Sequence, residues 1–245
     1  MAGMIRRFII VFFFLSIVTQ QGLLSAQSLP DSIQEKLEIM NPTEQIKYLS
    51  ELCWSLREKD NLLALDLGHQ ALSKAQDIND QKGIAKISNF VGVLYLHYFF
   101  NTRLAIPFFH DALENGLMTK DSIQIAYAYN NLGDAFYLNG NYQLAKDYAS
   151  KSFDFFTALN DLSGIAYSYV NIGLAQRLNH DYDNAIISFK KAIEYGQKAE
   201  EINREADVYM EIANTLFEQN KFDNAFDYYQ QSLDLHQKIN NLIYG

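Results

Sequence analysis

The sequence is poor in cysteine and proline, and these shortages limit the classes of structure it can form. Cys53 is the single cysteine of 245 residues, so no disulfide within the chain and no thiolate metal cluster is expected. It lies in the apolar helical stretch LSELCWSL, which predicts a small buried side chain rather than a reactive thiol. Three prolines and twelve glycines interrupt the chain. An apolar content of 49% with 20% charged residues excludes both a disordered chain and a membrane bundle.

Positive charge is also scarce. Twenty lysines and arginines stand against 29 acidic residues, which gives a formal net charge of −9. Proteins that bind nucleic acids or anionic lipid surfaces rely on lysine and arginine to displace counterions from phosphates. The charge therefore argues against nucleic acid as a partner and against binding to an anionic membrane surface.

The N-terminal segment has the pattern of an export signal. Arg6 and Arg7 precede an apolar run from Phe8 to Val18, and a small residue, Ala26, ends the segment. We expect residues 1–26 to be a signal peptide cut after Ala26, so that the protein is exported and becomes periplasmic or extracytoplasmic. Its loss would change the net charge from −9 to −11. The alternative is an uncleaved membrane anchor, but the run is about half of the roughly 20 residues that a spanning helix needs.

A segment of about 27 residues occurs three times at a spacing of 40. The copies begin at Ala126, Ala166 and Ala206, and the first reads AYAYNNLGDAFYLNGNYQLAKDYASKS. A fixed period of this size is the signature of a stacked repeat array, and apolar residues at helical spacing make each repeat a pair of helices. We expect an all-α, right-handed α-solenoid of stacked antiparallel helix pairs.

Small residues recur at fixed places within each pair. The second helices carry Ala64, Ala105, Ala145, Ala185 and Ala225. The first helices carry Gly92, Gly133, Gly173 and Ala213, seven residues after the opening alanine. Glycine inside a helix costs about 1 kcal/mol relative to alanine, so its recurrence predicts a close crossing of two helices at this point.

Short polar stretches such as Asn139-Gly140-Asn141 predict turns, with Gly140 left-handed and an Asx side chain capping the next helix.

These patterns divide the chain into four parts. After the signal peptide, residues 27–44 form a lead-in helix, which starts at Pro30-Asp31 and is broken by Asn41-Pro42. Residues 45–239 form about five helix pairs, the first of which begins with a helix from about Thr43 to Arg57. Residues 240–245 resemble the approach to a new first helix, so we expect them to start a truncated further repeat.

The repeats resemble the tetratricopeptide repeat (TPR) family. The family pattern of an aromatic residue, Leu-Gly, an aromatic residue and two alanines is found in the following residues: Tyr129, Leu132-Gly133, Phe136, Ala145 and Ser152, and again Tyr169, Ile172-Gly173, Tyr182, Ala185, Phe189 and Ala192. The period of 40 in place of 34 is similar to the variety of this family with longer helices. The export signal followed by long repeats also resembles the N-terminal region of bacterial envelope signalling proteins.

The resemblance implies a concave groove, lined by the first helices, that binds an extended or helical peptide. Carried over by position, the groove candidates are Asn89, Val93, His97, Tyr127, Asn130, Asp134, Tyr137, Tyr167, Val170, Leu174, Arg177, Asp207, Met210, Asn214 and Phe217. For each tyrosine, packing against a neighbouring helix is an equal alternative. The basic carboxylate clamp known in this family is not expected, because Asp134 and Leu174 replace its asparagines.

Signals of catalysis are weak. The five histidines are spread along the chain, without an HExxH motif, and no GxSxG, P-loop or GxGxxG motif occurs. We therefore expect no catalytic residue, cofactor or metal site, and we do not expect the chain to be an enzyme.

The sequence favours an exported scaffold that binds a protein or peptide ligand. Two alternatives remain. The chain could be the sensory front of a membrane histidine kinase or helix-turn-helix signalling protein whose output domain, and membrane helix, lie beyond Gly245. It could also be a purely structural assembly protein.

Overall fold

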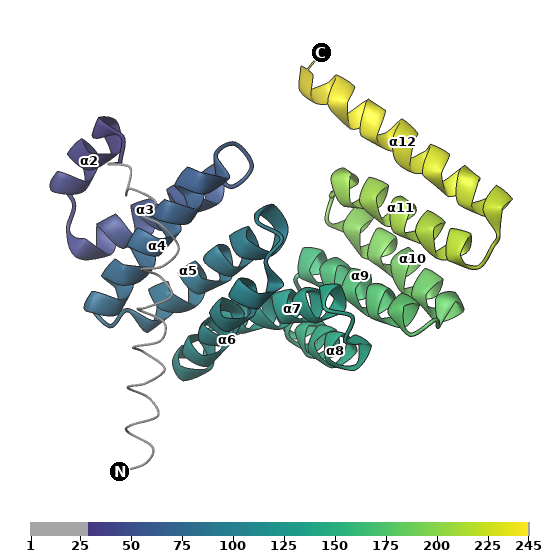
Figure 1. The fold of residues 1–245 in the computed structure, drawn as a ribbon, viewed down its shortest axis with the longest axis horizontal. Coiled ribbons are helices and arrows are strands. Elements are labelled where there is room, and N and C mark those ends of the chain that lie inside the picture. The colour runs from purple at the N-terminus through teal and green to yellow at the C-terminus, as the bar shows by residue number, and fades with distance from the viewer. Residues whose placement is uncertain (1–28, 245) are drawn as a thin grey trace, which may run out of the picture. The chain divides into compact units, whose positions relative to one another are not determined.

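The computed structural model describes residues 29–244 and divides the chain into two compact units. The first unit, which ends at Asn41, contains the helix α2 (Asp31–Glu38). The second begins at Pro42 and holds all the other helices (Figure 1). These are α3 (Pro42–Leu56), α4 (Asn61–Asp77), α5 (Gln81–Val93) with its extension η1 (Leu94–Tyr98), α6 (Thr102–Thr119), α7 (Ser122–Leu138), α8 (Tyr142–Leu159), α9 (Leu162–Leu178), α10 (Tyr182–Lys198), α11 (Ile202–Glu218) and α12 (Phe222–Tyr244).

The second unit is a stack of antiparallel helix pairs. Each helix packs on the next along the chain, and the pairs are α3 with α4, α5 with α6, α7 with α8, α9 with α10 and α11 with α12. The first helices of successive pairs also contact one another, so that α5, α7, α9 and α11 line one side of the stack. The expected all-α, right-handed α-solenoid is confirmed.

The turns from the one between α4 and α5 onward share one backbone conformation. In each of them the residue before the first residue that caps the next helix has a positive φ, and these residues are Asn79, Phe100, Lys120, Gly140, Asn160, His180, Glu200 and Asn220. The left-handed conformation predicted for Gly140 is confirmed, with φ at +73°. The predicted Asx caps are present at Asp80, Asp121, Asn141 and Asp161. The cap expected at Asp181 is absent, because its carboxylate instead accepts hydrogen bonds from the side chain of Asn184.

The recurring glycines lie where two helices cross closely, as predicted. A Cβ atom on Gly133 would lie 3.3 Å from both the backbone oxygen of Ala145 and the backbone nitrogen of Ala149 in the facing helix. On Gly173 it would lie 2.6 Å from Cε1 of Phe189, whose side chain is fully buried. The crossing at Gly133 is thus filled by the backbone of the second helix and the crossing at Gly173 by an aromatic ring, so a methyl group at either position requires its neighbours to shift.

One repeat contains an extra residue. Gly92 and Ala105 are thirteen residues apart, whereas Gly133 and Ala145 are twelve apart. Between Gly92 and Ala105 the helix continues as the π-helix η1, in which the N–H of Phe99 donates to the carbonyl of Leu94, five residues earlier. A π-turn absorbs one inserted residue without breaking the helix, so it keeps the following helix in register with the rest of the array.

The sequence made a prediction for each end of the second unit. α3 begins and ends within one residue of the expected limits. Cys53 in α3 is buried as predicted, and burial raises the pKa of its thiol to about 12. At the other end, α12 continues to Tyr244, and the truncated further repeat expected from residues 240–245 stays a prediction. The predicted signal peptide, residues 1–26, lies outside the described residues. Among residues 29–244, no helix has both the length and the apolar character needed to cross a membrane.

Candidate functional site

The predicted groove residues all lie on the first helices of the pairs, but they differ in exposure. Those exposed to solvent are His97, Tyr127, Tyr167, Asp207, Met210 and Phe217. Those partly buried are Val93, Asp134, Tyr137, Val170 and Asn214. Those buried are Asn89, Asn130, Leu174 and Arg177.

The buried asparagines connect neighbouring first helices. The side-chain amide of Asn171 donates to the backbone oxygen of Asn130 at 3.0 Å and to its side-chain oxygen at 3.1 Å. One repeat earlier, Asn131 donates to the side-chain oxygen of Asn89, and Asn89 donates to Gln124. A buried amide left without partners would be costly, so these contacts hold the helices in register. Asn89 and Asn130 therefore have a structural role in the array.

Arg177 is the centre of a second buried polar contact. Its guanidinium donates to the hydroxyl of Tyr137 at 2.8 Å and to a carboxylate oxygen of Glu211 at 2.7 Å, and Nε lies 3.7 Å from Glu218. Burial works to lower the pKa of Arg177, but the charge of Glu211 and the hydrogen bonds that Arg177 donates to Tyr137 and Glu211 outweigh it and raise the pKa. Two predicted groove residues, Tyr137 and Arg177, thus bind each other and link α7, α9 and α11.

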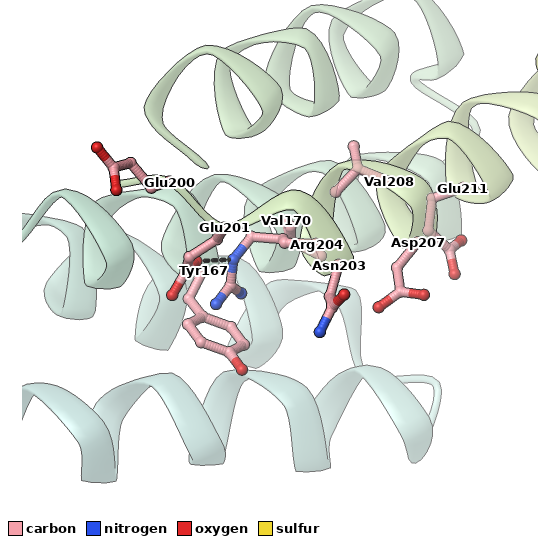
Figure 2. Close-up of a pocket in the computed structure, with 9 residues that line it drawn as sticks. All are labelled: Tyr167, Val170, Glu200, Glu201, Asn203, Arg204, Asp207, Val208 and Glu211. Carbon is pink, nitrogen blue, oxygen red and sulfur yellow. Dashed lines mark hydrogen bonds and ion pairs between the residues drawn. The ribbon is translucent and has the colours of Figure 1, made fainter. Parts of the chain in front are cut away.

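A groove lies on the first-helix side, between α9 and α11. Its volume is about 630 Å³, and it is drawn in Figure 2. The residues that line it are Tyr167, Val170, Glu200, Glu201, Asn203, Arg204, Asp207, Val208 and Glu211. Three of these, Tyr167, Val170 and Asp207, belong to the predicted set, so the structure brings together part of the set at one place.

One wall of the groove is an aromatic ring covered by a cation. The guanidinium carbon of Arg204 lies 3.3 Å from the centre of the Tyr167 ring, and Nε of Arg204 donates to Glu201 at 2.5 Å (Figure 2). Burial works to raise the pKa of the Glu201 carboxyl, but the hydrogen bonds from Arg204 and Ser163 lower it. Glu201 and Arg204 are thus charged and satisfied within the chain, and they hold the Tyr167 ring in place.

The sequence did not indicate Glu201 and Arg204. Both precede the opening alanine of their repeat, Ala206, and therefore lie outside the positions that recur between copies. The available signal was their position at the start of α11, where Glu201 is the N-cap residue and Arg204 lies in the first turn, next to Tyr167 of the preceding first helix.

The histidines and carboxylates of the described residues do not form a metal site. No group of three or more histidine, cysteine or acidic side chains converges in residues 29–244. Instead the histidines contact single partners: His69 the hydroxyl of Tyr95, His97 the carboxylate of Asp134, His180 the hydroxyl of Tyr182 and His236 the carboxylate of Asp207. The absence of catalysis, cofactor and metal stays a prediction.

Comparison with solved structures gives the same architecture at low sequence identity. The apo form of RapI matches with a TM-score of 0.67 and 15% identity, over 94% of this chain and 97% of that one. BtubC (BKLC) from P. vanneervenii matches with 0.66 and 20%, over 88% and 91%. A Rap protein complexed with competence and sporulation factor matches with 0.69 and 16%, and there the match covers 84% of this chain but 57% of the other.

The family comparison agrees with the repeat pattern. No curated protein matches the sequence. A family model described as "Tetratricopeptide repeat" matches residues 124–198 and residues 164–238, two overlapping segments offset by one period of 40. With the helix pairs, the small crossing residues and the stacked first helices, this match identifies residues 124–238 as tetratricopeptide repeats.

Proposed function

We propose that the chain is an interaction scaffold that binds a segment of another protein in the groove between α9 and α11. The observation that carries this proposal is the groove itself, about 630 Å³ in volume and open on the side where the first helices lie. Binding sites for peptides need a concave surface, a fixed aromatic or apolar contact, and polar groups for the peptide backbone.

The lining residues meet these requirements. Tyr167 is 43% exposed although Arg204 is stacked on its ring, and Val170 adds an apolar surface next to it. Asn203 supplies an amide that can both donate to and accept from a peptide backbone. Aromatic side chains held in place by their neighbours contribute strongly to binding because little conformational freedom is lost when a ligand arrives.

One structural neighbour supports a binding role. The Rap protein that shares this fold was solved in complex with competence and sporulation factor, so this type of array accommodates a bound factor in that protein. The shared fold supports a binding role for this chain, and the identity of the ligand is not transferred at 16% sequence identity.

The proposal is tested by selecting binders from a displayed library of random dodecapeptides with the purified chain. We expect binders whose affinity falls about tenfold in the Tyr167→Ala variant, a loss of about 1.4 kcal/mol, because the fixed aromatic wall is removed. Affinity is measured by fluorescence anisotropy with the selected peptide.

Tyr142→Ala is the matched control. Tyr142 begins α8 and is 42% exposed, almost the same as Tyr167, but it does not line the groove. We expect this variant to bind as the unchanged chain does. An equal loss in both variants, or a loss in Tyr142→Ala alone, would place the binding surface elsewhere.

We further propose that the protein acts outside the cytoplasm. The basic, apolar and small-residue parts of residues 1–26 support this proposal. Expression in a bacterial host should yield a periplasmic product whose mass corresponds to a chain that starts at Gln27. A product of full-length mass that stays with the membrane would support the uncleaved anchor instead.

The sensory region of a membrane signalling protein remains the second candidate function. The long TPR array after an export signal is what supports it. A hydrophobic run of about 20 residues followed by an output domain, in a reading frame extended past Gly245, would establish it.

A further inference from the structure

The groove between α9 and α11 has walls of different chemistry. Asn203, Asp207 and Glu211 follow one another at intervals of four residues on α11, so their side chains lie on one face of that helix, as Figure 2 shows. The facing wall, from α9, consists of Tyr167 and Val170. A ligand in the groove would therefore contact an aromatic and aliphatic surface on one side and two carboxylates on the other.

The charged side chains that line the groove differ in whether they have an ion-pair partner within the chain. Arg204 is engaged by Glu201, and one oxygen of Glu211 is engaged by Arg177 at 2.7 Å. Asp207 is in direct contact with His236, with 3.4 Å between Nε2 and Oδ1, and a histidine carries its charge only when it is protonated. Asp207 and Glu200 are thus the carboxylates of this groove that lack a permanently charged partner in a direct ion pair within the described residues, and Asp207 is the one that shares the face of α11 with Asn203 and Glu211.

The surroundings of Asp207 also disfavour its negative charge. Removal of water by the surrounding protein raises the pKa of its carboxyl, and the charge of Glu211 raises it further, while His236 and Arg204 act in the opposite direction. A cation brought by a ligand would relieve this repulsion. The side chain is nevertheless 64% exposed, so a ligand can reach it.

We infer that the segment bound in this groove presents a lysine or arginine side chain, whose cation lies beside the Asp207 carboxylate while its aliphatic stem packs on Tyr167 and Val170. This inference rests on the function proposed above and names the chemistry of the ligand. Long basic side chains suit such a site because their methylene groups cover apolar surface while the charged end reaches a carboxylate. The overall charge of −9 also favours the approach of basic segments over acidic ones.

The test uses four dodecapeptide pools, each random except for one central residue fixed as lysine, arginine, glutamine or glutamate. We expect the purified chain to retain the lysine and arginine pools about tenfold better than the glutamine pool, and the glutamate pool least. In the Asp207→Asn variant this preference should fall to about threefold or less, because the amide cannot form an ion pair. Asp207 is exposed, so the substitution leaves the fold intact, which is checked by the thermal unfolding midpoint.

Asp154→Asn, on α8, is the matched control because it removes the same charge from an exposed residue outside the groove. It should leave the preference for basic pools unchanged. An equal reduction in both variants would show general attraction to an acidic protein and overturn the inference. The inference would also be overturned if the glutamine pool bound as strongly as the basic pools and this binding depended on Tyr167. That result would leave the proposed peptide-binding function standing. Retention of no pool at all would overturn the proposed function and this inference together.

Discussion

Replacing Gly173 with alanine should lower the free energy of unfolding by about 1–2 kcal/mol, whereas replacing Gly196 with alanine should raise it by about 0.5–1 kcal/mol. Both glycines lie inside helices, where alanine is intrinsically better by about 1 kcal/mol. The difference comes from their neighbours. A methyl group on Gly173 would collide with the buried Phe189 ring, at 2.6 Å from Cε1, whereas on Gly196 its nearest neighbour is Cδ of Arg204 at 3.7 Å.

Urea unfolding followed by circular dichroism measures both effects. The double variant Gly173→Ala/Phe189→Leu should lose less than the sum of its two single variants, since the smaller side chain makes room for the methyl group. The Gly196→Ala variant serves as the control for helix propensity. If Gly173→Ala were as stabilising as Gly196→Ala, the steric explanation for the recurring glycine would be wrong.

The second large effect is expected at Arg177. Substitution by methionine, which has a similar length and a high helix propensity, should lower the free energy of unfolding by about 2 kcal/mol. The variant loses hydrogen bonds to Tyr137 and Glu211 and leaves the Glu211 carboxylate, which is 25% exposed, without its cation. A fully buried pair would cost about 3–5 kcal/mol, and the partial exposure of Glu211 reduces this.

The double variant Arg177→Met/Glu211→Gln separates the ion pair from simple packing. Because the charge on Glu211 is removed as well, we expect the double variant to recover about 1 kcal/mol relative to Arg177→Met. The same urea experiment provides the comparison, and the Lys190→Met variant, on an exposed part of α10, is a control for loss of positive charge. A loss below about 0.5 kcal/mol in Arg177→Met would mean that this contact does not stabilise the array.

The features of the fold that repeat were predictable from the sequence. The spacing of 40 residues between Ala145, Ala185 and Ala225 predicted the positions of the helix pairs. The glycines Gly133 and Gly173 predicted where the two helices of a pair cross closely. Such positions are predictable because every copy faces the same neighbour, so the physical constraint leaves the same residue type each time.

Features that occur once were harder to predict. The thirteen-residue interval from Gly92 to Ala105 contained the signal for the π-helix η1, but without a backbone the extra residue could equally lie in the turn. The left-handed residues Phe100, Lys120 and Glu200 carry side chains that normally avoid this conformation, so composition gave no indication of them. At these positions the packing of the two helices that the turn connects outweighs the preference of the single residue for a negative φ.

The candidate site was predicted only in part for a similar reason. Of the residues predicted from their position within the repeat, Tyr167, Val170 and Asp207 line the groove between α9 and α11, and their role in binding stays a prediction. Position within the repeat did not show that Asn130 is used to join α7 to α9, or that Arg204 covers Tyr167, because both depend on the partner that the neighbouring repeat supplies. We expect specificity to depend on residues that vary between copies, and the stacked structure shows which of them still face solvent.

The location of the ligand is the central claim, and photo-cross-linking tests it most directly without altering the protein. A dodecapeptide selected by the chain is resynthesised with benzoylphenylalanine at one position at a time, irradiated in complex with the unchanged protein, and the joined residues are identified by mass spectrometry. We expect cross-links to α9 and α11, within Leu162–Leu178 and Ile202–Glu218, around Tyr167 and Asp207. Cross-links confined to the second helices, α8 and α10, would contradict the account.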